Sequence, residues 1–245
     1  MVLITGGATG IGFALAEEFV SAGSVVAVCG RRKDRLTAAK RRLPALHTKR
    51  CDISVESQRK HLLSWTTSHF PNLNVLINNA GIQRQLDFTS PKVTESPYRE
   101  DDEVAINLHA AIRLCALFTP TLLKQKKAAI VNISSGLAFT PIAMMPIYCA
   151  TKAAIHSFTM SLRHQLRNTS VRVFEAAPPT TDTELDRSFA GEEEDAYRGI
   201  SPHEVAAAIV AGIKADREEI LIGEALALYK SARRNPHAIF NRLND

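Results

Sequence analysis

The stretch Val2-Leu3-Ile4-Thr5-Gly6-Gly7-Ala8-Thr9-Gly10-Ile11-Gly12 decides the fold, because an apolar run passes directly into a glycine-rich turn. The apolar run predicts a buried strand, and the residues after the turn predict a helix, which is the context of a phosphate-binding turn. Glycine permits positive φ and close approach of a ligand. The helix N-terminus offers unpaired N–H groups to a pyrophosphate. The spacing is TGxxxGxG rather than GxGxxG, so the turn alone does not establish a dinucleotide-binding site and other motifs in the chain are needed.

Outward from this turn, short apolar runs alternate with helix-length segments. We expect strands at 2–5, 25–29, 46–51, 75–78, 129–133, 171–176 and 220–222. We expect helices at about 11–22, 33–43, 55–69, 98–124, 147–167 and 202–215. Several strand runs lack polar alternation, as expected where both faces of a parallel sheet are covered. The order predicts an α/β fold: a doubly wound, Rossmann-type parallel sheet of about seven strands, with helices on both faces, in a single domain over 1–245.

The composition is that of a soluble globular protein, with 45% hydrophobic and 22% charged residues in a chain of 245. No apolar run approaches the roughly 18 residues that span a bilayer, and the first residues lack the basic region of a signal peptide. Four widely spaced cysteines without a CxxC pair argue against a disulfide framework and against a zinc site. We therefore expect a cytoplasmic protein with no metal and no membrane partner.

The net charge of +5 raises the possibility of a nucleic-acid partner, but the excess charge lies in one segment. Residues 31–50 contain nine Lys or Arg and a single acid, Asp34. No aromatic residue is interleaved with these charges, as single-strand nucleic-acid binding would favour. We therefore expect no nucleic-acid partner, and most of these charges to lie on a solvated helix face.

Arg31 and Arg32 are singled out because they follow the second predicted strand. In such folds an acidic residue at this point binds the ribose 2′-hydroxyl of NAD, whereas an arginine accommodates the 2′-phosphate of NADP. Here no acid precedes Asp34, and the planar guanidinium is well suited to phosphate. The sequence therefore predicts NADP(H) as the cofactor, with Arg31 as the main phosphate contact.

Tyr148 and Lys152 form the strongest chemical motif. They are four residues apart, so they share one face of a helix that we expect to begin near Pro146. A phenol has an ordinary pKa near 10, and a neighbouring ammonium lowers it. The pair is therefore a plausible proton donor to a carbonyl oxygen. Upstream, either Ser134 or Ser135 ends a predicted strand and could bind that oxygen, or could simply belong to a turn.

Asp52, Asn78 and Asn79 also follow predicted strands, on the ligand side of such sheets. Asp52 could contact an adenine or could cap a helix. The asparagines could bind a ligand or could tie neighbouring strand ends together. The residues themselves leave both questions open.

In combination, the motifs resemble the short-chain dehydrogenase/reductase family, in its subclass of about 250 residues. The matches occur in family order over nearly the whole chain: TGxxxGxG at 5–12, Asp52, Asn-Asn-Ala-Gly at 78–81, Asn107, Ser135, and Tyr148 with Lys152. Segments 74–84, 134–139 and 148–157 show a closer resemblance to the DltE-like branch of bacterial oxidoreductases.

The resemblance implies a role for each residue of the catalytic set. Tyr148 is the general acid in reduction and the base in oxidation, and Lys152 lowers its pKa and binds the nicotinamide ribose. Ser135 positions the substrate oxygen and is preferred to Ser134, because it lies thirteen residues before Tyr148. Asn107 holds a water in a proton relay through Lys152.

The resemblance also implies a set of cofactor-binding residues from several parts of the chain. They are Gly6, Thr9, Gly10, Ile11, Gly12, Arg31, Arg32, Asp52, Ile53, Asn79, Ala80, Gly81, Tyr148, Lys152, Pro178, Thr181 and Thr183. The chain departs from most of the family at Pro178-Pro179, where Pro-Gly is usual, although the DltE-like branch shares the double proline. Proline fixes φ and removes an N–H, which leaves the contacts of 178–183 open.

The function that follows is NADPH-dependent reduction of a ketone or aldehyde to an alcohol. The alternatives are a dehydrogenase that oxidises a secondary alcohol with NADP+, and a non-catalytic NADP(H)-binding regulator that would not need the intact Asn, Ser, Tyr and Lys set. We expect a small hydrophobic substrate, because the pocket should be lined by Leu137, Phe139, Ile142, Met144 and Met145. The two methionines could instead be core or interface residues.

Two expectations concern larger features. The composition changes at about 178–200, which predicts a lid over the substrate, the alternative being a solvated connection. The segments 98–124 and 147–167 are rich in small residues, and family members commonly pair these helices. We therefore expect a homodimer or homotetramer. We have no functional account of residues 229–245.

Overall fold

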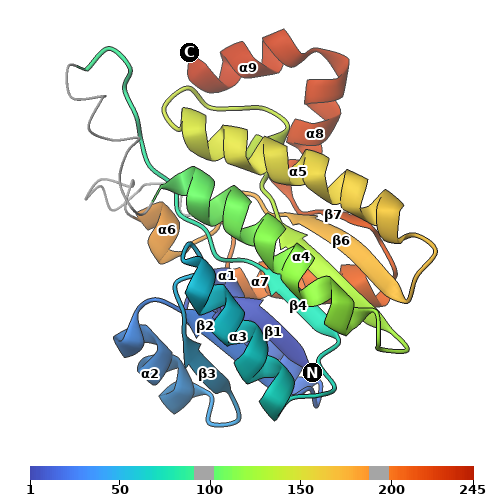
Figure 1. Cartoon of the computed structure of the whole chain (residues 1–245). Helices are drawn as coiled ribbons and strands as arrows, with labels where there is room; N and C mark the ends of the chain where they lie inside the picture. The colour runs from blue at the N-terminus through green and yellow to red at the C-terminus, as the bar shows by residue number, and fades with distance from the viewer. Residues whose placement is uncertain (91–101, 188–198) are drawn as a thin grey trace.

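Seven parallel strands form one sheet between two layers of helices in the computed structural model (Figure 1), which describes residues 1–90, 102–187 and 199–245. The strands are β1 (Val2–Thr5), β2 (Val26–Gly30), β3 (His47–Arg50), β4 (Val75–Asn78), β5 (Ala128–Ile133), β6 (Val171–Ala177) and β7 (Glu219–Leu221). Their order is β3-β2-β1-β4-β5-β6-β7, and every neighbouring pair is parallel. The direction of winding reverses beside β1, which is where ligands bind in open α/β sheets.

The helices cover both faces of the sheet, as the sequence predicts. One apolar cluster packs α1 (Gly10–Ser21), α2 (Lys33–Arg42) and α7 (Pro202–Lys214) against one face. A second cluster packs α3 (Glu56–His69), α4 (Ala111–Leu122) and α5 (Pro146–Leu166) against the other. In β1, Val2 and Ile4 belong to the first cluster and Leu3 to the second, so burial on both faces removes the alternation expected of a half-exposed strand. The doubly wound α/β fold is confirmed.

The helix expected at 98–124 begins with an unusual turn. A π-helix spans Val104–Ala110 and continues directly into α4, while residues 98–101 lie outside the described part. Such wide turns frequently occur at functional sites. Within the described chain, the continuous segment Val104–Leu122 is the one helix long and apolar enough to cross a membrane. Its side chains Ile106, Leu114 and Phe118 lie in the core, and core helices commonly pass this test.

The C-terminal region contains two helices that the sequence analysis did not predict, α8 (Glu224–Arg234) and α9 (Pro236–Asn244). They bury few residues, chiefly Ala225 and Ile239, although the apolar residues of each lie on one side of the helix. One available signal was Asn235-Pro236, because the Asn235 side chain accepts a hydrogen bond from Ala238 N at 3.0 Å at the start of α9. α8 contacts the short 3₁₀ turn η3 (Gly136–Ala138) after β5.

The expected lid at 178–200 is described only in part. It contains a short helix, α6 (Glu184–Arg187), and residues 188–198 lie outside the described residues. A parallel bridge joins Thr181 to Ile200, so the two ends of the segment are tied together. Closure of a lid here stays a prediction.

Candidate active site

The glycine turn joins β1 to α1 and has the backbone that its sequence predicts. Gly6 and Gly10 have φ of +63° and +54°, values that residues with a Cβ rarely adopt. Gly12 lies inside α1, where a Cβ would come within 2.4 Å of Gly6 O and 2.5 Å of Asn79 Nδ2. Gly12 therefore permits close packing of the helix on the turn rather than contact with a ligand.

Side chains at the ends of β1 and β4 hold this turn in place. Thr5 Oγ1 accepts hydrogen bonds from Asn79 N at 3.0 Å and Ala80 N at 3.1 Å. Asn79 Nδ2 donates in return to Thr5 O at 3.0 Å and Gly6 O at 3.2 Å. Asn78 Nδ2 donates to Asn132 Oδ1 on β5 at 2.8 Å. Of the alternatives left open by the sequence, the asparagine side chains therefore tie strand ends together.

A cavity of about 480 Å³ opens at the carboxyl ends of the strands. Most of the predicted residues line it: Gly6, Thr9, Gly10, Ile11, Arg31, Arg32, Asp52, Ile53, Asn79, Ala80, Gly81, Tyr148, Lys152, Pro178 and Thr183. The fold thus brings together residues from the first turn, from the ends of four further strands (β2, β3, β4 and β6) and from α5. Among the described residues, no group of three or more His, Cys, Asp or Glu side chains is placed to hold a metal ion.

Four predicted residues do not line this cavity: Gly12, Asn107, Ser135 and Thr181. Thr181 is buried, and its Oγ1 donates to Pro179 O at 2.9 Å, which fixes the chain after the double proline. Conversely, the cavity wall includes residues that the sequence analysis did not single out, among them Arg35, Ile82, Arg84 and Glu184. Arg35 lies in the first turn of α2. Its place in the cavity wall could have been predicted, because it follows Arg31 and Arg32 closely in the sequence.

Tyr148 and Lys152 lie one turn apart on α5, which begins at Pro146 as predicted. Lys152 Nζ lies 5.5 Å from the centroid of the Tyr148 ring and donates to Ile133 O at the end of β5 at 2.9 Å. Burial lowers the pKa of Lys152 to about 8, and the nearby negative charge of Glu175 acts in the opposite direction. The ammonium therefore lies beside the phenol with its position fixed by a backbone carbonyl.

Asn107 lies in the π-helix and is buried. Its Oδ1 accepts from Ile82 N at 2.9 Å, and its Nδ2 donates to Ile82 O at 2.8 Å and to Thr151 Oγ1 at 3.2 Å. The side chain thus joins the segment after β4 to α5. A Cβ added to Gly81 would lie 3.3 Å from Asn107 Oδ1 and 3.7 Å from Lys152 Nζ. Both side chains therefore lie beside Gly81, which leaves room for them because it has no side chain.

The two serines after β5 make different contacts. Ser134 lines the cavity, and its hydroxyl donates to Ala176 O at 3.3 Å. Ser135 is 8% exposed, and its hydroxyl accepts from Leu137 N at 3.1 Å at the start of η3. Ser135 stays our prediction for the group that binds the substrate oxygen, with η3 fixing its rotamer.

Charged residues surround the far end of the cavity. Arg31 Nη1 lies 3.9 Å from Asp52 Oδ2. Glu184, at the start of α6, contacts Arg32 Nη1 at 2.9 Å and Arg35 Nη2 at 3.0 Å. It therefore links the start of α2 to the segment across the cavity, since Arg32 is the N-cap of α2 and Arg35 lies in its first turn.

Asp52 lies in a tight turn at this end of the cavity. Its Oδ1 accepts from Ser54 N at 2.9 Å and Ser54 Oγ at 2.6 Å. The following helix, α3, has Val55 as its N-cap, so Asp52 forms a local turn rather than the helix cap considered above.

The residues predicted to form the substrate pocket are only partly clustered. Leu137, Ile142 and Met145 pack with Tyr148 in a small apolar cluster. Phe139 instead packs edge-on against His156 and Tyr229, with ring centroids 5.0 and 4.9 Å away. Met144 is 51% exposed.

The cavity suits a dinucleotide. The positive φ of Gly6 and Gly10 leaves a turn without side chains ahead of the N-terminus of α1, as an approaching pyrophosphate requires. The arginines at one end offer donors to an anionic group, and Tyr148 and Lys152 stand at the other.

Comparison with known proteins agrees with this geometry. A family model described as short chain dehydrogenase matches residues 1–194. The chain is 47% identical over 243 residues to the uncharacterized oxidoreductase DltE of Bacillus subtilis (strain 168), covering 99% of this chain and 96% of that protein. It is 31% identical over 207 residues to serine 3-dehydrogenase of Rhizobium radiobacter, covering 82% of this chain and 81% of that enzyme.

Solved structures share the whole fold. A short chain dehydrogenase from Burkholderia cenocepacia J2315 in complex with NADP has a TM-score of 0.81 at 25% identity, covering 99% of this chain and 96% of that chain. A short chain dehydrogenase/reductase from Burkholderia phymatum in complex with NAD has a TM-score of 0.83 at 22% identity, covering 100% of this chain and 95% of that chain. At this identity the similarity shows the fold alone. The chain therefore belongs to the short-chain dehydrogenase/reductase family, in its DltE-like branch.

Proposed function

We propose that this oxidoreductase reduces a ketone or aldehyde to an alcohol with NADPH. One observation carries the proposal: the glycine turn, Arg31, Tyr148 and Lys152 all line one continuous cavity. A dinucleotide bound with its pyrophosphate at the turn would extend from the arginines at one end to Tyr148 at the other.

The residues around Tyr148 account for the proton transfer. NADPH, when bound, supplies the hydride. Tyr148 donates its hydroxyl proton to the substrate oxygen, and the Lys152 ammonium beside it stabilises the phenolate that remains. Ser135 donates a second hydrogen bond to the substrate oxygen, where negative charge develops. Asn107 holds the π-helix against Ile82 and α5, so it keeps the path of a proton relay to Lys152 in place.

The charges at the far end of the cavity favour NADPH over NADH. Arg31 and Arg32 lie where an acidic residue would bind the ribose 2′-hydroxyl of NAD. Arg32 is engaged by Glu184, whereas the contact of Arg31 with Asp52 is long, at 3.9 Å. Arg31 therefore has the donors that a 2′-phosphate requires. Solved relatives are complexes with NADP or with NAD, so the proposed preference rests on Arg31.

The substrate is expected to be small and hydrophobic. The apolar cluster of Leu137, Ile142 and Met145 lies against Tyr148, so it would contact the groups attached to the carbonyl carbon. A methionine adapts to substrates of different shapes. Oxidation of a secondary alcohol would use the same residues in reverse.

The test is NADPH consumption with a panel of hydrophobic ketones and aldehydes, run in parallel with NADH. We expect turnover with NADPH, and at least about tenfold lower kcat/KM with NADH. Tight NADPH binding without turnover of any carbonyl would overturn the reductase proposal and favour an alcohol dehydrogenase or a regulator.

A further inference from the structure

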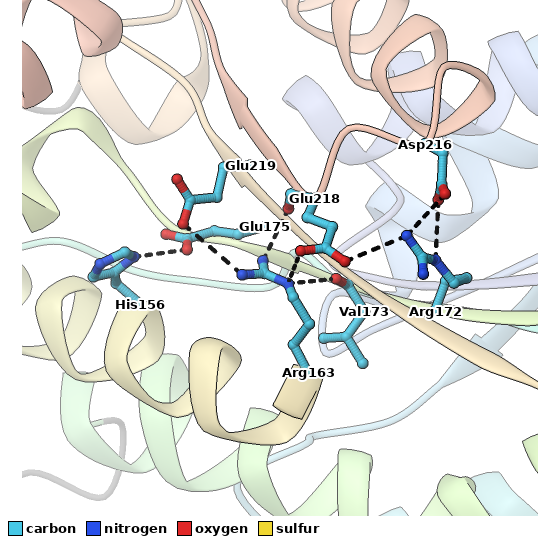
Figure 2. A network of polar contacts seen from close by, with 8 residues as sticks. All are labelled: His156, Arg163, Arg172, Val173, Glu175, Asp216, Glu218 and Glu219. Carbon is cyan, nitrogen blue, oxygen red and sulfur yellow. Dashed lines mark hydrogen bonds and ion pairs between the residues drawn. The ribbon is translucent and has the colours of Figure 1, made fainter. Parts of the chain in front are cut away.

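A second ionisable pair, His156 on α5 and Glu175 on β6, joins this helix to this strand (Figure 2). His156 Nδ1 lies 2.7 Å from Glu175 Oε2. His156 follows Lys152 by four residues, so both side chains lie on the same face of α5. Glu175 precedes Ala176, which is in register with Ile133, and the Ile133 carbonyl is the one that Lys152 Nζ contacts. The carboxylate thus lies one strand away from the anchor of the catalytic ammonium.

Glu175 is a buried charge that its hydrogen bonds satisfy only in part. The residue is 1% exposed, and within the described part of the chain Oε1 has no hydrogen-bond partner. A buried ion pair commonly stabilises a fold no better than an apolar pair of similar volume, because both charges must lose their water. The contribution of the pair to folding therefore does not by itself account for a carboxylate at this position.

The charged groups around the pair are few. His156 faces Glu175 on β6, Glu219 on β7 and Arg163 on its own helix. Arg163 is occupied elsewhere: its Nε donates to Val173 O at 3.0 Å, and its guanidinium lies within 4 Å of Glu218 and Glu219 (Figure 2). Among the residues that the structure describes, the cations left to balance Glu175 are His156 and Lys152.

We propose that Glu175 is a positioning residue for the reaction: its carboxylate, held by His156, sets the electrostatic field at Lys152 and keeps that ammonium charged. The inference rests on the proposed function, in which Lys152 acts as a cation beside Tyr148. The two influences on the pKa of Lys152 agree in direction with this role of Glu175. Burial lowers the pKa of Lys152 to about 8, and Glu175 opposes that shift. Removal of the carboxylate charge would therefore let Lys152 lose its proton at a lower pH.

The first test is the pH dependence of kcat/KM for carbonyl reduction in the Glu175→Gln variant. Glutamine keeps the size of the side chain and a hydrogen bond to His156 but removes the charge. We expect the alkaline limb of the profile to move to lower pH by about one unit. Glu218→Gln is the matched control, because Glu218 is a half-exposed carboxylate of the same network and its charge is not among the causes that shift the Lys152 pKa. An unmoved limb in Glu175→Gln, or an equal shift in both variants, would overturn the inference.

A second readout does not depend on turnover. The side-chain nitrogen of Lys152 can be titrated by NMR in ¹⁵N-lysine-labelled protein, with its signal assigned by Lys152→Arg. We expect the Lys152 pKa to be lower in Glu175→Gln than in the wild type. If no carbonyl is reduced but this pKa still falls, the proposed function fails and the electrostatic role of Glu175 stands. An unchanged pKa overturns that role, whatever the activity.

A double variant provides the same test if Glu175→Gln alone does not fold. His156→Gln/Glu175→Gln replaces the ion pair by two amides that can hydrogen-bond to one another. The Lys152 pKa is again expected to lie below its wild-type value, because the double variant also lacks the Glu175 charge that raises it. A double variant that folds but titrates like the wild type contradicts the proposal.

Discussion

Arg31 is the residue on which the expected cofactor preference depends most. It lines the cavity at the end of β2, and its long contact with Asp52 leaves its guanidinium available to an anion. Charge-assisted hydrogen bonds of this kind contribute about 1.5–3 kcal/mol. We therefore expect Arg31→Ala to weaken NADPH binding by about 10- to 100-fold and to leave NADH binding nearly unchanged.

Fluorescence titration with each dinucleotide measures this difference. Arg41→Ala is the control for net charge, because Arg41 is an exposed residue of α2 outside the cavity. Equal loss of affinity for NADPH and NADH in Arg31→Ala would show that the 2′-phosphate is not what Arg31 binds.

At the residue scale, the sequence predicts which side chains meet better than it predicts what they do. Motif order alone placed Tyr148, Lys152 and Arg31 in one cavity. The role of Asn79 could not be settled in that way, because its partners, Thr5 O and Gly6 O, are brought to it only by the pairing of β1 with β4. The His156–Glu175 pair was missed for the same reason, since its members are adjacent only after β6 enters the sheet.

At the scale of elements, the contact between α1 and the glycine turn depends on Gly12. An added Cβ would lie 2.4 Å from Gly6 O, a distance that requires the helix or the turn to move. We expect Gly12→Ala to lower the free energy of unfolding by about 1–3 kcal/mol and to weaken dinucleotide binding as well. Urea denaturation and a binding titration measure the two effects.

Gly30→Ala provides the comparison for Gly12→Ala. The nearest atom to its added Cβ is 3.9 Å away, which is ordinary contact. We expect this variant to unfold at nearly the wild-type urea concentration. Similar unfolding of both variants would contradict the packing role of Gly12.

The attachment of α5 to β6 should depend on pH through His156. Its hydrogen bond to Glu175 raises the pKa of His156 above the ordinary value of 6.5. The protonated imidazole is therefore favoured in the folded state. Its contribution to stability is fully present below pH 6.5 and is lost as the pH rises through the raised pKa.

Urea denaturation of the wild type and His156→Gln at pH 5.5 and pH 9 tests this sign. We expect the difference in the free energy of unfolding between the two proteins to be about 1–2 kcal/mol larger at pH 5.5. A difference that is equal at both pH values, or larger at pH 9, would show that the ion pair contributes no pH-dependent stability.

Most elements were predicted correctly, and the errors have physical reasons. All seven strands were found within a residue or two of their ends: β1, β2, β4, β5 and β6 are apolar runs that are largely buried, whereas the edge strand β3 is partly exposed. The π-helix at Val104–Ala110 has no signal in apolar spacing, since its extra residue per turn is accommodated by packing against α5 and the segment after β4. α8 and α9 were missed although both are amphipathic, and they bury chiefly Ala225 and Ile239.

At the scale of the whole molecule, we expect a homodimer or homotetramer in which α4 and α5 pair between subunits. Both helices cover the same face of the sheet, and their outer positions include Ala116, Ala153 and Met160, which are exposed in the single chain (Figure 1). Small residues on a flat face allow two helices to pack closely. We expect Ala116→Arg to produce a monomer of about 27 kDa by light scattering, and the control Ala38→Arg on α2 to leave the oligomer intact. A wild-type monomer at micromolar concentration would contradict this assembly.

The central claim is that the cavity transfers a hydride to a carbonyl carbon while Tyr148 supplies the proton. The most direct measurement uses NADPH with deuterium at C4 of the nicotinamide, a ketone found in the panel, and mass spectrometry of the product, for the wild type and Tyr148→Phe. We predict one deuterium on the alcohol carbon in the wild type, and at least about 100-fold less product in Tyr148→Phe with NADPH binding retained. An alcohol without deuterium, or full activity in Tyr148→Phe, would contradict the account.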